Sequence, residues 1–123
     1  MPDLCEIDNQ EQFYKGQFTA VLDEVKNYLE NYPNIYFYKG LFPSTTEPII
    51  DKKFSFVNLD VDIYESTLNC IEFVYPRMSK GGIIISHDYI SAPGVRRAFG
   101  DFFENKPEQI IELSGSQCMV VKI

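Results

Sequence analysis

The sequence predicts an α/β layered fold with a mostly parallel sheet and a C-terminal antiparallel hairpin. Segments with strand character alternate with segments of helical periodicity, which is typical of a parallel sheet flanked by helices. The run IIIS at 83–86 is apolar before its final serine, as expected for a strand covered on both faces. At 123 residues and 45% hydrophobic content, we expect one domain over residues 1–123.

The first half of the chain predicts one helix and two strands. Apolar residues recur at helical spacing from Thr19 to Tyr32, and Pro33 is expected to end that helix. NIYFYKG (34–40) predicts a short strand with a glycine exit, followed by a proline-containing loop. FSFVNLDV (54–61) is rich in apolar and aromatic residues and predicts a second strand.

The next helix is expected within residues 65–82. Ser66 or Thr67 can cap its N-terminus by accepting a backbone N–H bond. Pro76 bends or ends the helix, and the pair Gly81–Gly82 terminates it.

The C-terminal part predicts a strand, a helix and a hairpin. The strand is 83–86, and Pro93 suits the first turn of the helix that follows. The helix is expected to turn these residues inward: Val95, Ala98, Phe99, Phe102 and Phe103. Two apolar runs in 109–123 flank a serine-glycine-serine turn, which predicts the antiparallel hairpin.

Composition excludes several classes of function. A net charge of -7 argues against nucleic-acid binding, because phosphate contacts need a basic surface. No apolar run is long enough to span a bilayer, so no membrane partner is expected. Three cysteines without metal-ligand spacing fit reduced thiols, and we expect a cytoplasmic protein.

Polar side chains follow two consecutive predicted strands. Asp60 and Asp62 come at the end of the strand at 54–61, and His87 and Asp88 follow the strand at 83–86. Ligands of open α/β sheets collect outside the carboxyl ends of the strands. Two carboxylates and an imidazole suit Mg²⁺ or a similar divalent ion, which acidifies a coordinated hydroxyl while a nearby carboxylate takes the proton.

The same residues also have an ordinary structural interpretation. Aspartate is common in strand-to-helix loops because it forms turns and caps, and Asp62 in particular could cap the next helix. Arg96 and Arg97 could bind a substrate anion or form surface salt bridges. Tyr64 and Tyr89 could line a pocket or pack at the sheet edge.

Four segments resemble, in order, one known family. They are FYKGQFTAVLDEVKNYL, FYKGLFPST, FSFVNLDVDIYESTLNCIEFVYPRMSKGGIIISHDY and APGVRRAFGDFF, which lie roughly within residues 13–105. They resemble the macrocin O-methyltransferase (TylF-type) family of class I, S-adenosylmethionine-dependent methyltransferases. The segment D-x-D-x-Y-E-S-T is the most specific part, together with P-x-x-x-x-G-G-x-x-x-x-x-D-Y.

The resemblance implies a Rossmann-like sheet whose carboxyl edge holds the cofactor, and Mg²⁺-dependent methylation of a hydroxyl, often on a sugar. It implies Asp60 as a metal ligand and catalytic base, His87 and Asp88 as further ligands, and a loop including Gly40, Leu41 and Phe42 beside the adenine. Where the family usually has Asp-Asp-Tyr, this chain has His87-Asp88-Tyr89. The imidazole favours softer ions such as Mn²⁺, Fe²⁺ or Zn²⁺ over Mg²⁺.

One part of the family pattern is missing. The family carries a glycine-rich strand-turn-helix that holds the methionine part of the cofactor, and this chain has no G-x-G sequence. The chain therefore resembles only the C-terminal part of a methyltransferase domain. In the family, two strands separate the counterparts of 34–38 and 54–61; without them 54–61 becomes an apolar edge.

Three consequences of that missing part stay open. The chain dimerises through 54–60, or 34–38 closes the gap, or the chain is a piece of a longer protein. The leading function is a truncated, S-adenosylmethionine-dependent, divalent-metal-assisted O-methyltransferase acting on a small-molecule hydroxyl of a sugar or natural product. One alternative is a non-catalytic methyltransferase-like domain that dimerises or interacts. Another is a D-x-D glycosyltransferase binding Mn²⁺ and a sugar nucleotide.

Overall fold

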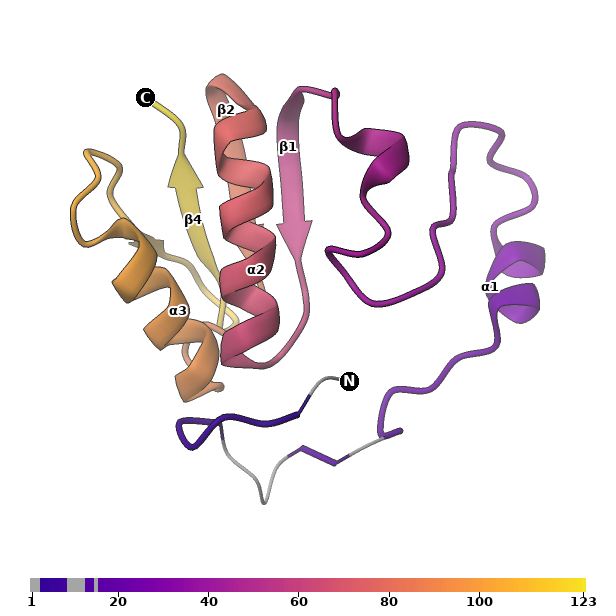
Figure 1. Ribbon diagram of the computed structural model, residues 1–123, viewed down its shortest axis with the longest axis horizontal. Coiled ribbons are helices and arrows are strands. Elements are labelled where there is room, and N and C mark those ends of the chain that lie inside the picture. The colour runs from indigo at the N-terminus through magenta and orange to yellow at the C-terminus, as the bar shows by residue number, and fades with distance from the viewer. Residues whose placement is uncertain (1–2, 9–12, 15) are drawn as a thin grey trace.

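A four-stranded sheet with two helices packed on one side forms the body of the protein. The computed structural model describes residues 3–8, 13–14 and 16–123. In spatial order the strands are β1 (Phe54–Leu59), β2 (Met78–Ser86), β4 (Cys118–Val121) and β3 (Ile111–Glu112). The helices α2 (Tyr64–Val74) and α3 (Pro93–Phe103) lie side by side over the sheet (Figure 1). Every helix in the described residues is too short or too polar to cross a membrane.

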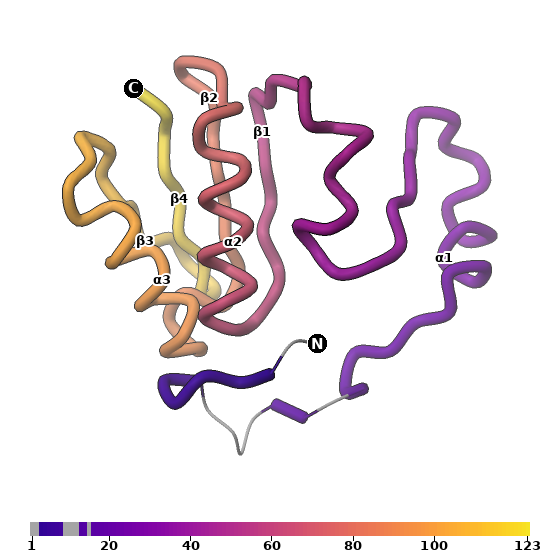
Figure 2. The backbone as a smooth tube through the Cα atoms, viewed as in Figure 1, coloured from indigo at the N-terminus to yellow at the C-terminus, as the bar shows by residue number. Residues whose placement is uncertain are grey.

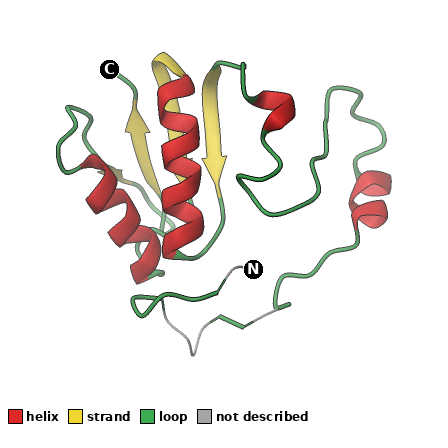
Figure 3. Ribbon diagram, viewed as in Figure 1, coloured by secondary structure: helices red, strands yellow, loops and turns green. Residues whose placement is uncertain are grey.

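The sheet has the mixed directions that the sequence predicts. β1 and β2 are parallel, with Leu59 beside Ser86, whereas β4 runs antiparallel to both β2 and β3. The arrows of β1 and β4 accordingly point in opposite directions in Figure 3. The helix-side face of β2 is well packed, since Ile84 is fully buried. The prediction that 83–86 is covered on both faces is wrong, because Ile83 and Ile85 on the opposite face are only half-buried.

That opposite face of the sheet carries an apolar row, which we call the bare face. Cross-strand pairing places Ile83 between Phe56 and Val121, and Met119 between Ile85 and Ile111. Phe56 is 57% exposed, and Val121 and Ile111 are exposed as well. An apolar row of this kind marks a surface that a partner or further polypeptide would cover.

The segment before β2 differs from its prediction. Helix α2 ends at Val74, a 3-10 turn follows over Tyr75–Arg77, and β2 starts at Met78 instead of continuing a helix to Gly82. Pro76 sits in that turn, where its missing N–H ends the helix. Gly81 then adopts a φ of 78° inside a bulge that lets Phe56 pair with Ile83. The glycine pair bends a strand here rather than ending a helix.

Residues 16–53 form an extended arm with little packing of its own. Helix α1 (Leu22–Tyr28) ends well before Tyr32 and buries none of its residues, all of which the structure describes. The predicted strand at 34–38 is wrong: these described residues are unpaired, and Tyr36 is 76% exposed. A strand needs a neighbour to hydrogen-bond with, and within the described residues β1 pairs only with β2. The idea that 34–38 closes the gap is therefore wrong as well.

The remainder of the arm connects α1 to the sheet. It lies beyond β1, on the side away from α3 and the hairpin (Figure 2), and includes a 3-10 turn at Glu47–Ile49.

Helix α3 and the hairpin confirm their predictions. Pro93 opens α3, and Val95, Ala98, Phe99 and Phe103 are buried, with Phe102 partly so. Phe99 packs edge-to-face on Tyr89 with ring centroids 5.9 Å apart. Two buried thiols complete this core, and burial raises the pKa of Cys70 to about 11 and that of Cys118 to about 12. Both cysteines are core residues.

Asp8 fixes the N-terminal segment to the starts of α2 and α3. Its Oδ1 accepts the Tyr64 N–H at 2.8 Å and its Oδ2 accepts the Cys5 N–H at 2.9 Å, with only 4% of the residue exposed. Gly94 leaves room for this carboxylate, because a Cβ there would lie 1.9 Å from Asp8 Oδ1. Asp8 thus satisfies a donor at the start of α2.

The capping role predicted for Ser66 or Thr67 is therefore wrong. In the described part of the chain the N-cap position of α2 is Ile63, without a side-chain cap, and the Thr67 hydroxyl instead donates to the Ile63 carbonyl at 2.8 Å.

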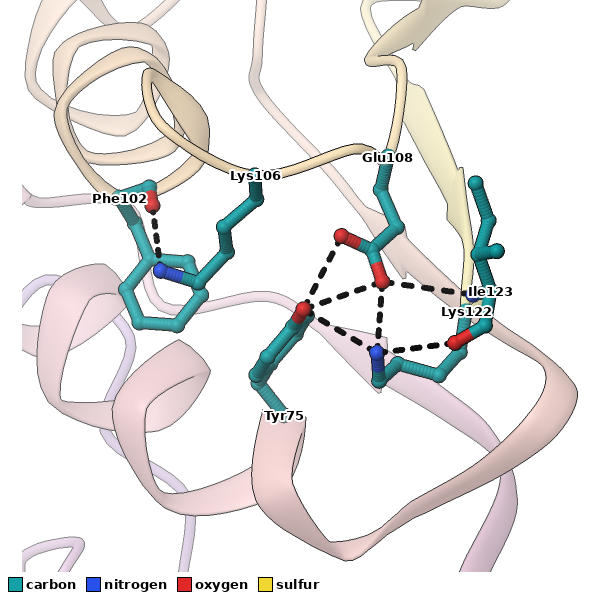
Figure 4. A network of polar contacts seen from close by, with 6 residues as sticks. All are labelled: Tyr75, Phe102, Lys106, Glu108, Lys122 and Ile123. Carbon is teal, nitrogen blue, oxygen red and sulfur yellow. Dashed lines mark hydrogen bonds and ion pairs between the residues drawn. The ribbon is translucent and has the colours of Figure 1, made fainter.

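A buried glutamate ties the C-terminus to the end of α2 (Figure 4). Glu108 is 3% exposed and accepts hydrogen bonds from Lys122 Nζ at 2.7 Å and from the Tyr75 hydroxyl at 3.0 Å. Burial alone would raise the pKa of Glu108, but the hydrogen bonds from Lys122 and Tyr75 outweigh it and hold the pKa below the ordinary 4.5. The carboxylate therefore stays charged and paired inside the protein.

Removing the cation of this pair should destabilise the fold. We expect Lys122→Met to lower the free energy of unfolding at pH 7 by about 3 kcal/mol, because Glu108 is left as an unpaired buried charge. A depressed folded-state pKa stabilises the fold above pH 4.5, and this contribution is lost as pH falls through the folded value. The difference between wild type and variant, measured by urea unfolding, should therefore shrink below pH 4.5. Lys80→Met, on an exposed lysine, is the control.

The Asp8 tether can be tested with two substitutions that disturb the same contact. Asp8→Ala should cost about 1–2 kcal/mol of unfolding free energy, as for the loss of a helix cap. Gly94→Ala should act on the same hydrogen bond by displacing Asp8, so the double variant should lose less than the sum. Gly100→Ala on the same helix, where a Cβ meets nothing within 4 Å, should be neutral or stabilising. Additive losses in urea unfolding would contradict a shared contact.

Candidate functional site

Three potential metal ligands meet at the carboxyl ends of β1 and β2. Asp60 follows β1, and His87 and Asp88 follow β2. The parallel register brings them together, since the His87 N–H donates to the Leu59 carbonyl at 2.8 Å. Each residue offers one ligand atom, and these atoms all lie within 4.8 Å of one another. His87 Nδ1 lies 2.7 Å from Asp88 Oδ2 and 3.8 Å from Asp60 Oδ1.

The charges in this cluster influence each other. The hydrogen bond to Asp88 and the charge of Asp88 raise the pKa of His87. Burial alone would raise the pKa of Asp88, but hydrogen bonds from His87 and Ser91 outweigh it and lower that pKa. Asp88 Oδ1 accepts the Ser91 hydroxyl at 2.8 Å, so both of its oxygens have partners.

Asp62 also faces this cluster. The prediction that it could cap α2 is wrong, because the N-cap position of that helix is Ile63. Asp62 adopts a left-handed φ of 64°, which directs the turn after β1. Burial, followed by the charges of Asp88 and Asp60, raises the pKa of Asp62 to about 6. The sequence contains the indication in its D-x-D spacing, but spacing alone leaves the direction of the second carboxylate open.

The cluster lines a pocket of about 470 Å³ that the N-terminal segment helps to form. Phe13, Gln17 and Phe18 contribute the remaining lining. Phe13 is buried, whereas Phe18 is 65% exposed. No local pattern in the sequence places these three residues at the site, because they lie over forty positions before Asp60 and only the fold brings them near.

A second, less polar pocket of about 290 Å³ adjoins the first. The three residues expected near an adenine, Gly40, Leu41 and Phe42, all line it. Phe42 is held edge-to-face on Phe73 of α2, with ring centroids 5.3 Å apart. The remaining lining residues are Phe18, Val61, Asp62, Ser66 and Cys70. Since Phe18 and Asp62 line both pockets, a molecule in one would lie next to a molecule in the other.

Arg96, Arg97 and Tyr64 lie outside both pockets. Arg96 pairs with Glu112 at 2.9 Å, and Arg97 pairs with Asp101 at 2.7 Å. The Tyr64 hydroxyl also bonds Asp101, at 3.1 Å. Surface ion pairs therefore account for the two arginines, and Tyr89 packs in the core.

The donor set fits a divalent cation, and the apolar pocket fits part of a nucleoside cofactor. Two carboxylates and one imidazole suit Mn²⁺ and related ions, and the exposed position of Asp60 leaves room for a substrate oxygen. The apolar pocket, at about 290 Å³, is slightly smaller than the roughly 300–1,000 Å³ typical of ligand sites. It accommodates one end of such a cofactor rather than all of it.

Comparisons with known proteins identify the family to which the chain belongs. The sequence profile of the family described as "Macrocin-O-methyltransferase (TylF)" matches residues 5–113. A Streptomyces olivaceus relative, 8-demethyl-8-(2,3-dimethoxy-alpha-L-rhamnosyl)-tetracenomycin-C 4'-O-methyltransferase, is 31% identical over 80 residues, covering 62% of this chain and 31% of the relative. Demethyldecarbamoylnovobiocin O-methyltransferase of Streptomyces niveus is 29% identical over 84 residues, covering 65% of this chain and 32% of the relative.

A solved structure supports the fold. The O-methyltransferase NovP superimposes with a TM-score of 0.73 at 23% identity, over 82% of this chain and 44% of NovP. The chain thus spans about a third of the length of its curated relatives and less than half of the solved one. With the profile matched over residues 5–113, the chain belongs to the macrocin O-methyltransferase (TylF) family.

Proposed function

We propose that this chain is the C-terminal, acceptor-side part of an S-adenosylmethionine-dependent, divalent-metal-assisted O-methyltransferase. The observation that carries the proposal is the convergence of Asp60, His87 and Asp88 within 4.8 Å at the carboxyl edge of the sheet. The family assignment favours methyl transfer over the D-x-D glycosyltransferase alternative.

The chain's residues have distinct tasks in this proposal. Asp60, His87 and Asp88 hold the cation, which would acidify an acceptor hydroxyl when bound. Asp60 is the proposed base, and its exposed carboxylate can reach a proton on an acceptor in the acidic pocket. Phe13 closes one wall of that pocket against water.

The two adjoining pockets supply the alignment that methyl transfer requires. The attacking oxygen must lie in line with the sulfonium methyl group, so acceptor and donor must meet end to end. We place the acceptor in the acidic pocket and the adenine end of the donor beside Gly40, Leu41 and Phe42. The boundary formed by Phe18 and Asp62 is where the two molecules approach.

The proposed acceptor is a hydroxyl on a sugar-bearing natural product. The names of the two relatives describe methylation of a rhamnosyl tetracenomycin and of a novobiocin precursor. Because His87 replaces one carboxylate oxygen with nitrogen, we propose Mn²⁺ as a better fit than Mg²⁺.

The metal site is tested by Mn²⁺ titration of the purified chain. Asp60→Asn should weaken Mn²⁺ binding at least about 10-fold, measured by calorimetry and by the spin resonance of free Mn²⁺. Glu72→Gln, which removes an exposed carboxylate of α2, should leave the affinity unchanged. Equal affinity of wild type and Asp60→Asn would remove Asp60 from the site.

A separate titration with S-adenosylhomocysteine tests whether the chain alone binds the cofactor. Absence of both heat and thermal stabilisation would contradict cofactor binding by the chain alone.

A second function, self-association, is favoured by the open edge of β1. The Leu59 carbonyl faces β2, because it accepts the His87 N–H. Backbone groups alternate along a strand, so those of Phe56 and Asn58 face away from β2. In the described residues no strand pairs with this edge, and residues 54–59 contain no proline or charged side chain to protect it.

For the 123-residue chain by itself, without further strands of a longer methyltransferase, we propose that the occupant of this edge is a second copy of the chain. Antiparallel pairing about a two-fold axis at Phe56 sets the two Phe56 rings side by side. The same register sets exposed Lys52 of one copy beside exposed Asp60 of the other, so opposite charges meet at both ends.

Light scattering after size exclusion tests this pairing. The wild-type mass should be that of a dimer at micromolar concentration, and Phe56→Lys should halve it by placing two like charges opposite each other. Tyr36→Lys, at an exposed aromatic residue of the arm, should stay dimeric. A wild-type monomer, or a dimer untouched by Phe56→Lys, would exclude this interface.

A further inference from the structure

A chain of hydroxyl groups connects the C-terminal hairpin to Asp88. The Ser116 hydroxyl donates to Ser91 Oγ at 2.9 Å, and the Ser91 hydroxyl donates to Asp88 Oδ1 at 2.8 Å. Ser116 Oγ also accepts the Ser91 N–H at 2.9 Å, so two hydrogen bonds join the two serines. Ser91 lies in the loop between β2 and α3, whereas Ser116 lies in the turn between β3 and β4.

The turn is shaped to present this hydroxyl. Ser116 has a φ of 70°, which serine rarely adopts, directly after Gly115 with a φ of 73°. The Leu113 N–H closes the base of the turn on the Gln117 carbonyl at 2.9 Å. Through this geometry the turn reaches a loop 25 residues earlier in the chain.

We propose that Ser116 is a positioning residue for the metal site, acting through Ser91 to set the orientation of the Asp88 carboxylate. Ser91 occupies Oδ1, so Oδ2 is the oxygen turned to His87, 2.7 Å from Nδ1. A carboxylate with one oxygen fixed in this way presents the other in a single direction. Partners behind metal ligands typically change metal affinity 10- to 100-fold.

This inference rests on the proposed metal site and extends it to the hairpin. Ser91→Ala should weaken Mn²⁺ binding about 10-fold, and Ser116→Ala by a smaller factor, because it acts at one remove. Ser116→Gly removes the same hydroxyl in a residue that suits the positive φ, so it should match Ser116→Ala if the hydroxyl matters. Ser91→Thr keeps a hydroxyl and should restore binding.

Ser114→Ala is the matched control, since it makes the same change in the same turn. In the described residues Ser114 is exposed and has no hydrogen bond to Ser91 or Asp88. Its Mn²⁺ affinity should equal that of wild type. Urea unfolding of every variant shows whether a weaker affinity comes from a looser fold.

A measurement without metal separates this inference from the proposed function. His87 is the chain's only histidine, so its ring nitrogens are assigned in the ¹⁵N spectrum without ambiguity. Loss of either hydroxyl should shift the Nδ1 resonance at fixed pH by freeing Asp88, while Ser114→Ala should not. Unchanged spectra with unchanged Mn²⁺ affinity would overturn the positioning role. If the variants have altered spectra but the wild-type protein binds no Mn²⁺, the hydrogen-bonded chain of hydroxyls is supported. Its role at a metal site is then overturned, together with the proposed metal site.

Discussion

The parallel pairing of β1 with β2 is the constraint on which the site depends. It sets Leu59 beside Ser86, so that the next residues of both strands, Asp60 and His87, leave the sheet at the same level. A slip of one residue would invert the faces of β1 and turn its buried Leu59 to solvent. Burial of β1 therefore fixes the register that places Asp60 next to His87, although neither residue contributes to that burial.

The polar residues come from two parts of the chain that are packed very differently. The ligands follow two strands of the sheet over which α2 and α3 lie. At the opposite end, Glu108 ties the turn before β2 to the end of β4 through Tyr75 and Lys122. Phe18 and Gly40, in contrast, belong to the arm, whose helix α1 buries nothing among its described residues. Local stability follows buried contacts, so the acidic half of the site is the firmer half.

Predictability from sequence follows the range of the interaction. The polar strand ends, α3 and the hairpin can be predicted from the sequence, because each depends on residues close to it in the chain. The position of Gly81 in a strand bulge cannot be predicted in this way, because a glycine pair suits both a helix end and a strand bulge. The hydrogen bond between Asp8 and Tyr64 joins residues 56 positions apart, and no local sequence pattern predicts it. The strand at 34–38 failed because propensity is local whereas pairing needs a partner.

The bare face of the sheet has a consequence for how the chain behaves during synthesis and storage. Phe56, Ile111 and Val121 present apolar area on one face of the sheet, which other unfolded or partly folded chains can contact in many orientations. Such encounters grow with the square of concentration, whereas folding of a single copy does not. The concentration at which the chain is made would then decide how much of it stays dispersed.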